Sequence, residues 1–169
     1  MRIYIIKTGN SAQTGVVGLA DMDCDGINLM ISTRELVKHI SHLPQNRLSI
    51  LLEIQNIVAV SAPTATVELR RYGVVYYDGA RGGPVSAGIC QTLIKPGHIR
   101  LAFIHGAFLP DPRHLLQGST FPKRYLPIQD YDSAPWDYIE FLIKAHSQFD
   151  PYSLLPGEVE KAREKKTNG

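Results

Sequence analysis

The feature that most constrains the fold is a pair of strand-like segments joined by a tight turn. Residues 99–104 alternate in character, with Ile99, Leu101 and Phe103 in the odd positions. Successive side chains of a strand point to opposite faces, so these three are expected to share one buried face. The preceding segment, residues 95–98, reads Lys-Pro-Gly-His and is typical of a turn, and residues 87–94 are rich in apolar side chains. The sequence therefore predicts a β-hairpin over residues 87–104.

Three further segments have the composition of strands. Val67 and Leu69 alternate with charged residues, residues 74–77 form a β-branched and aromatic run, and residues 125–128 are typical of a last strand. Residues 67–77 fit either two strands or one bent strand, and residues 2–7 are one more candidate. We expect an antiparallel sheet of about five strands.

Helical patterns flank these segments on both sides. Residues 32–35, Ser-Thr-Arg-Glu, have the spacing of a capping box and begin a short helix that ends at Pro44. Residues 45–60 carry a broad apolar stripe at helical spacing, although their β-branched residues would also suit a strand. A last helix is predicted from Ser133 until Pro151. Helices that precede and follow a run of strands predict an α+β fold.

The chain has 169 residues, a formal net charge of +2 and 44% apolar residues, which indicates one globular domain. So small a charge gives no field that would collect nucleic acid or an anionic membrane. The apolar stretches fall far short of the ~20 residues of a membrane span, and the first residues are too briefly apolar for a secretory signal. Cys24 and Cys90 lack a partner spacing. We expect a cytoplasmic protein with reduced thiols, and neither nucleic acid nor membrane as a partner.

The α+β domain is expected to cover residues 31–150. Residues 1–30 lack helical periodicity, and Met30 directly precedes the capping box, so we interpret them as an N-terminal extension or a misassigned start. Residues 151–169 are charged and poor in large apolar side chains, and they are predicted to form a disordered tail.

Asp21, Asp23 and Asp25, followed by Gly26, match the start of a calcium-binding loop, in which alternate carboxylates point inward. The twelfth position counted from Asp21 is Ser32 in place of the bidentate glutamate, so the ligand set is incomplete. A solvated acidic turn is the simpler interpretation, and a calcium loop is the alternative.

Glu35, His39 and His42 are spaced i, i+4 and i+7, which places them along one strip of the predicted first helix. Two imidazoles and one carboxylate suit zinc or ferrous iron. These three residues are therefore the candidate metal site, and an exposed polar face is the alternative interpretation.

A second candidate site is a small anion-binding region around the basic pair Lys123 and Arg124. Neighbouring strand residues point to opposite faces, so at most one of this pair is expected to face a given pocket. His98, His105 and Asp111 complete the candidate ligand-binding set.

Three motifs occur in a fixed order in the second half of the chain. They are K-P-G-H-I-R-L-A-F-I-H-G-A-F-L-P-D-P over residues 95–112, L-L-Q-G over residues 115–118 and K-R-Y-L-P-I over residues 123–128. In order and spacing they resemble the YdhG-like family, whose function is unknown, and residues 35–73 resemble its N-terminal half more loosely. The resemblance covers about residues 32–149.

The resemblance implies helices packed on a curved antiparallel sheet, as in frataxin-like sandwiches, and no established reaction. Some members are described as intracellular iron chaperones, a role that in frataxin-like proteins uses a carboxylate-rich helix and strand edge. This sequence differs there, because Glu35 and Glu53 are the only acids of its first two predicted helices. A surface of many carboxylates for a hard cation is therefore missing.

The function expected from these observations is a non-enzymatic binding module for a metal, a small ligand or a protein, with residues 105–123 as its most distinctive surface. The alternative is a metal-dependent or acid-base enzyme acting on a small anionic substrate, with His98, His105 and Asp111 around one pocket. Convergence of these three side chains distinguishes the two. A homo-oligomer or a complex with another protein is compatible with either function.

Overall fold

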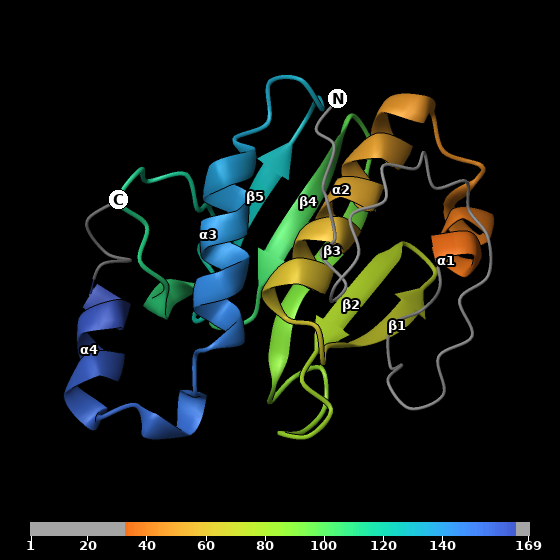
Figure 1. Ribbon diagram of the computed structural model, residues 1–169. Helices are drawn as coiled ribbons and strands as arrows, with labels where there is room; N and C mark the ends of the chain where they lie inside the picture. The colour runs from red at the N-terminus through yellow and green to blue at the C-terminus, as the bar shows by residue number, and fades with distance from the viewer. Residues whose placement is uncertain (1–32, 165–169) are drawn as a thin grey trace, which may run out of the picture.

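The computed structural model describes residues 33–164, which form a five-stranded antiparallel sheet with helices packed on it (Figure 1). The strands lie side by side in chain order, and the sheet does not close into a barrel. They are β1 (Thr66–Arg70), β2 (Gly73–Tyr77), β3 (Gly88–Lys95), β4 (His98–Phe103) and β5 (Arg124–Ile128). The prediction of an α+β fold with a curved antiparallel sheet is confirmed, and residues 67–77 form two strands.

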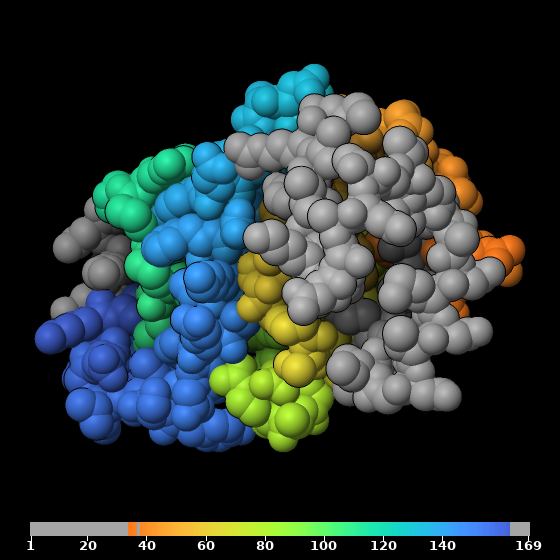
Figure 2. All heavy atoms as spheres, in the orientation of Figure 1, coloured from red at the N-terminus to blue at the C-terminus, as the bar shows by residue number. Residues whose placement is uncertain are grey.

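The helices that cover the sheet are α1, α2 and α3. Their bounds are Thr33–Ile40, Gln45–Ser61 and Trp136–Ser147. Helices α2 and α3 lie next to each other across one face of the sheet (Figure 1), and the space-filling view shows α3 packed closely against the visible part of α2 (Figure 2). Residues 45–60, for which the sequence also allowed a strand, are helical because Ile50, Ile54 and Ile57 recur on the buried side of α2.

The core lies between the helices and the inner face of the sheet. Ile99, Leu101 and Phe103 are fully buried there, which confirms that they share one face. Leu101 lies opposite Leu126 of β5, and each apolar side chain buried in this way contributes about 1.5–3 kcal/mol to folding. The hydroxyl of Tyr76 donates a 2.9 Å hydrogen bond to the side-chain carbonyl of Gln55, so this buried polar pair is mutually satisfied.

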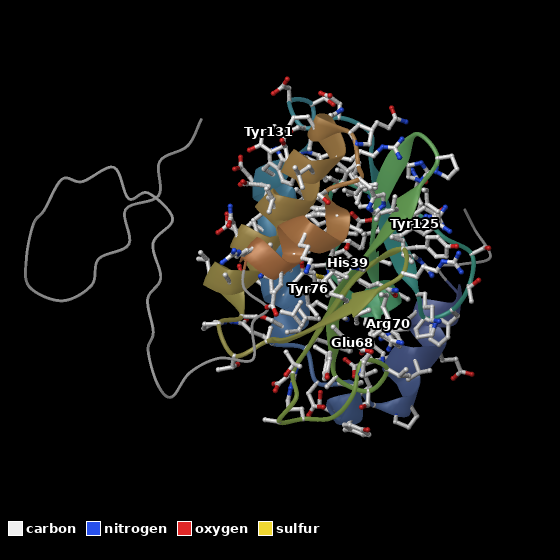
Figure 3. The ribbon with its side chains drawn as sticks, turned by 90° about the vertical axis from the view of Figure 1, so that its right-hand side faces the viewer. His39, Glu68, Arg70, Tyr76, Tyr125 and Tyr131 are labelled. Carbon is white, nitrogen blue, oxygen red and sulfur yellow. The ribbon has the colours of Figure 1, made fainter. Side chains whose placement is uncertain are left out.

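The other face of the sheet carries the alternate side chains of each strand. Figure 3 turns the molecule so that α1 and α2 lie to the left of the sheet, and this second face looks to the right. The strand register places one row of residues across it: Glu68, Val75, Gln91, Ala102 and Tyr125. The candidate binding site lies on this face.

The segment after α3 differs from its predicted disorder. Residues 151–164 contain the 3-10 turn η2 (Pro151–Ser153) and helix α4 (Pro156–Glu164). The Asp150 side chain accepts a hydrogen bond from the Tyr152 amide, the Glu158 carboxylate accepts one from the Leu155 amide, and Ala162 is buried. Local capping and one small apolar contact therefore order a segment whose composition is mostly charged.

Several sequence predictions lie outside the described residues. These are the N-terminal extension with its acidic turn at Asp21, Asp23 and Asp25, the cap residue Ser32 and the final residues 165–169. Among the described helices, none has the length and apolar character needed to span a membrane.

Candidate ligand-binding site

A hollow of about 620 Å³ lies on the face of the sheet opposite α1, α2 and α3. Its walls come from the β1–β2 turn, strands β2, β3 and β4, the loop at residues 84–85 and Lys123 just before β5. It is about twice the volume of two other hollows, of about 320 and 310 Å³, and lies in the range of small-molecule sites.

The hollow exists because the middle of this face carries small side chains. Val75, Gly88 and Ala102 line it, and Gly73 lies in β2 next to the lining residue Tyr72. Gly73 has φ +156°, and a Cβ atom there would lie 1.8 Å from the carbonyl oxygen of Thr92. A Cβ at Gly88 would lie 2.5 Å from the carbonyl oxygen of Pro84. These close approaches of backbone require glycine at both positions, and Gly88 is the one of the two that lines the hollow.

The rim of the hollow is positively charged. Arg70, Arg71 and Lys123 line it, and no aspartate or glutamate does. The nearest carboxylate partner is Glu68, which forms a 2.9 Å ion pair with Arg70. Both side chains of that pair are largely exposed, so the pair is weak and leaves Arg70 available to a ligand. The Arg71 guanidinium lies 5.0 Å from the centre of the Tyr72 ring, a cation–π contact that holds it at the rim.

A fourth cation, Arg100, lies beside the hollow on the same face. Arg100 is opposite the lining residue Leu93 in the β3–β4 register, and its guanidinium stacks 3.9 Å from the centre of the Tyr125 ring. Its Nε atom is buried and has no hydrogen-bond partner among the described residues. The hollow therefore has four cationic side chains and one carboxylate, Glu68, in or beside it, and this net positive charge favours an anionic ligand.

The lining offers no ordinary acid-base pair. Cys90 reaches it from the core side, but burial raises the pKa of this thiol far above its usual range, so it stays protonated and a poor nucleophile. Cys90 is therefore an interior thiol. The remaining lining residues include neither histidine nor carboxylate. The geometry favours binding over proton transfer.

Lys123 and Arg124 separate as the alternation of strand residues predicts. Lys123 lines the hollow. The Arg124 guanidinium instead donates to the carbonyl oxygens of Lys123 and Thr120, at 2.7 and 3.4 Å, and so holds its own loop. Of the five residues predicted to bind a ligand, Lys123 alone lies in the lining of this hollow.

His98 and His105 lie at opposite ends of the same extended segment. His98 begins β4, where its Nδ1 atom lies 3.3 Å from the carbonyl oxygen of Pro96, and His105 follows the end of the strand. Seven extended residues span roughly 20 Å, so the two rings do not meet. The His105 ring packs instead against His146 and Phe149, with ring centres 5.8 and 5.7 Å apart, and burial lowers its pKa.

Asp111 forms hydrogen bonds with its own loop and with α3. Its carboxylate accepts hydrogen bonds of 3.0 Å from the amides of Leu115 and Leu116, and another from the Tyr138 hydroxyl. Its role is to fix the fold of residues 111–116. The arrangement of His98, His105 and Asp111 around one pocket, which the acid-base enzyme required, is not found.

The candidate metal residues do not form a cluster in the structure. Helix α1 ends at Ile40, so His42 lies past its end and is not carried onto the strip of Glu35 and His39. The His39 Nε2 atom lies 2.9 Å from the carbonyl oxygen of Arg70 and ties α1 to β1. Across residues 33–164, no group of three or more histidine, cysteine or acidic side chains is placed to hold a metal ion.

Sequence reasoning missed most of the hollow because its residues form no motif. Arg70, Arg71 and Tyr72 come from a hairpin turn, and the floor comes from three strands. The available signal was the outward position of Ala102 between the inward residues Leu101 and Phe103. A small residue in an outward position indicates a low point on that face, but it does not say which neighbours surround it.

Comparison with known proteins gave no match to a protein-family model, to a curated protein or to a solved structure. The resemblance to the YdhG-like family therefore stays a prediction. Only the fold and the geometry of the hollow bear on function.

Proposed function

We propose that this protein is a non-enzymatic binding module that holds a small anion with an apolar body in the hollow of its sheet. The observation that carries the proposal is the combination of three cationic side chains at the rim, an apolar floor and no carboxylate in the lining. Of the ligand classes that the sequence left open, this arrangement favours a small organic ligand over zinc or iron.

The floor and the rim of the hollow contribute to binding in different ways. Covering the floor removes apolar surface from water, at about 25 cal/mol per Å². The arginine and lysine side chains orient the ligand by charge-assisted hydrogen bonds, which are about twice as strong as neutral ones. A ligand of about 20 heavy atoms that gains about 0.3 kcal/mol from each would bind with a Kd of tens of micromolar.

We also propose that the chain is a YdhG-like protein of the cytoplasm. The three ordered motifs of residues 95–128 support the family, and an α+β fold on an antiparallel sheet agrees with what the resemblance implies. The composition supports a cytoplasmic location. So do the two cysteines, because their spacing matches no disulfide framework. Association with a second copy of the chain or with another protein is compatible with this function.

The test uses two fluorescent probes that share an apolar body. 8-Anilinonaphthalene-1-sulfonate is anionic, and N-phenyl-1-naphthylamine is its neutral counterpart. We expect saturable fluorescence enhancement with the sulfonate and at least tenfold weaker binding of the amine. Equal affinity for the two probes would show that the cations take no part and would contradict the proposal.

Two matched variants locate the probe. Ala102→Leu fills the floor of the hollow and is expected to weaken sulfonate binding about tenfold, whereas Ala59→Leu adds the same volume at an exposed position of α2 and should have no effect. Melting curves of both variants check that the fold is retained. Unchanged sulfonate binding in a folded Ala102→Leu protein would place the probe elsewhere and reject the site.

A further inference from the structure

The cations of the hollow stand at its two ends, with the apolar floor between them. Arg70 and Arg71 belong to the end of β1 and the turn after it, whereas Lys123 directly precedes β5. In the sheet order, β1 and β5 are the two edges, and β2, β3 and β4 separate them. The three cations of the lining therefore form two groups, and Arg100 of β4 lies beside the hollow outside that lining.

The floor between the two groups is mostly apolar, and Gln91 of β3 is its one polar lining residue. Val75 of β2, Leu93 of β3 and Ala102 of β4 line it in the order of the strands. Four strand spacings of about 4.8 Å put the edge strands roughly 19 Å apart, and the register sets Lys123 about four residues, or roughly 13 Å, further along the strands than Arg70. The two backbone positions are then roughly 23 Å apart, and a reach of about 6 Å by each long side chain leaves an interval of roughly 10 Å between the charges.

We infer that the ligand of this hollow is an elongated dianion with an apolar chain between two anionic groups, such as an α,ω-dicarboxylate. One carboxylate is held by Arg70 and Arg71, the other by Lys123, and the chain between them lies on Val75, Leu93 and Ala102. An arginine pair suits a planar, bidentate carboxylate, and the lysine ammonium suits a single point charge. A monoanion would leave one cationic end without a partner. This inference rests on the proposed function and names its ligand class.

The experiment compares sebacate, a ten-carbon dicarboxylate, with decanoate, the monocarboxylate of equal length, by isothermal titration calorimetry on the full chain. Sebacate is expected to bind at least tenfold more tightly than decanoate. Arg71→Gln and Lys123→Gln are each expected to reduce sebacate affinity about tenfold. Lys144→Gln, which removes the same charge from an exposed position of α3, is expected to leave it unchanged.

The outcomes separate this inference from the proposed function. Decanoate binding as tightly as sebacate, or sebacate binding that survives Lys123→Gln in a folded protein, would overturn the dianion and leave a monoanion site. Absence of binding by both acids, with the naphthalene sulfonate still bound, would overturn the dianion alone. Absence of binding by the acids and by the sulfonate would overturn the proposed function as well.

Discussion

The Tyr138 hydroxyl of α3 donates a hydrogen bond to the Asp111 carboxylate, which also accepts two amide hydrogen bonds within its own loop. Burial, and secondarily this hydrogen bond, raise the pKa of Tyr138 to about 12. The contact joins the most distinctive sequence motif of the chain to the last core helix. It also explains why Asp111 is a structural residue and lies outside the candidate site.

Removing this carboxylate should therefore lower stability and leave binding unchanged. Asp111→Ala leaves the buried Tyr138 hydroxyl and two loop amides without their acceptor, and we expect a loss of about 2 kcal/mol in the free energy of unfolding by urea. The affinity for the naphthalene sulfonate should stay within about twofold of the wild type. Loss of sulfonate binding in an Asp111→Ala protein that remains folded would show that Asp111 takes part in ligand binding.

His39 is expected to act as a tether and not as a metal ligand. His39→Ala removes the contact of 2.9 Å with the Arg70 carbonyl oxygen and should reduce stability by about 1 kcal/mol, whereas His42→Ala, at an exposed position past α1, should be neutral. A zinc titration followed by thermal unfolding should leave the melting temperature unchanged in all three proteins. A saturable stabilisation lost in both variants would instead restore the predicted metal site, since a ligand at a hundred times its Kd contributes about 2.7 kcal/mol.

Gly73 is expected to be the least replaceable glycine of the sheet. An added Cβ would lie 1.8 Å from the Thr92 carbonyl oxygen, so Gly73→Ala must displace β2 from β3, and we expect a loss of about 4 kcal/mol or a failure to fold. Gly97→Ala is the matched control, because Gly97 also has a positive φ, +84°, but open space around it. Its cost should be about 1 kcal/mol. Equal losses in the two variants, measured by chemical denaturation, would show that backbone strain alone decides both.

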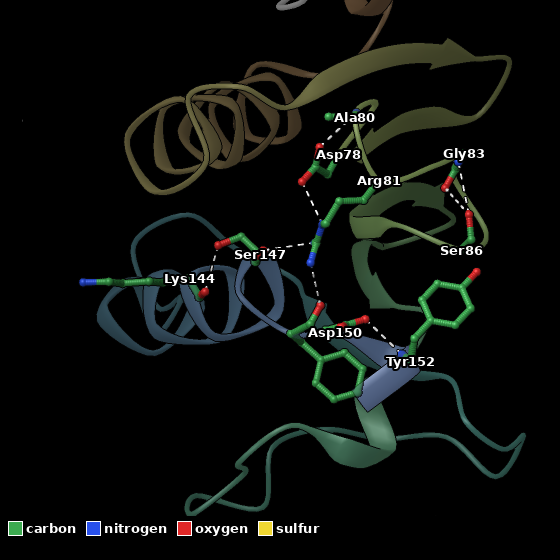
Figure 4. A network of polar contacts seen from close by, with 10 residues as sticks. Asp78, Ala80, Arg81, Gly83, Ser86, Lys144, Ser147, Asp150 and Tyr152 are labelled. Atoms are coloured by element: carbon green, nitrogen blue, oxygen red, sulfur yellow. Dashed lines mark hydrogen bonds and ion pairs between the residues drawn. The ribbon is translucent and has the colours of Figure 1, made fainter. Parts of the chain in front are cut away.

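Arg81 fastens the loop after β2 to the end of α3 (Figure 4). Its guanidinium donates to the Asp78 carboxylate at 2.8 Å and to the carbonyl oxygens of Phe149 and Ser147 at 3.1 and 3.2 Å. The side chain is about one third exposed, so we expect Arg81→Ala to cost only about 1 kcal/mol.

The planar fork of the guanidinium is what allows three partners at once, so Arg81→Lys should recover little of that loss. Hydrogen exchange should show faster opening of residues 147–153 in both Arg81 variants, while the amides of β4 stay protected. An Arg81→Lys protein as stable as the wild type would contradict this. It would show that a positive charge near the end of α3 stabilises the helix through its dipole, without the three hydrogen bonds.

The sequence predicted the architecture because local patterns decided it. The alternation of Ile99, Leu101 and Phe103 gave both the strand and its buried face, and the turn residues gave the hairpin. Residues 45–60 stayed ambiguous because β-branched side chains suit either element, and only packing against the sheet decides between them. Helix α4 was missed because its composition indicates a solvated tail, whereas caps and the burial of Ala162 order it.

The candidate site was far less predictable than the fold. The histidines and Asp111 stand out in the sequence, but His105 and Asp111 are used in packing and in loop closure. The small residues of the hollow, Val75, Gly88 and Ala102, belong to no motif, and their importance comes from the register that brings them together with the others. The register between strands that are distant in the sequence depends on the whole sheet, so local sequence patterns do not predict it.

The His146 ring is expected to make the protein lose stability in mild acid. It is buried, its Nδ1 atom contacts the carbonyl oxygen of Ile89, and its Nε2 atom has no partner among the described residues. Burial, and less strongly the nearby His105 and Arg81, lower its pKa to about 4, against a partial opposing effect of the Ile89 contact.

The sign follows from proton linkage. Between about pH 6.5 and pH 4 the unfolded chain binds a proton at His146 that the folded chain refuses, so stability is complete above this window and falls as the pH is lowered through it. Urea unfolding at pH 7 and at pH 5 should differ by about 2 kcal/mol from this residue. His146→Phe retains a ring against Phe103 and Phe149 and should reduce the pH dependence by that amount, whereas His42→Phe, at an exposed site, should not. A pH dependence that is identical in wild type and His146→Phe would show that His146 titrates normally and that its buried position opens readily to water.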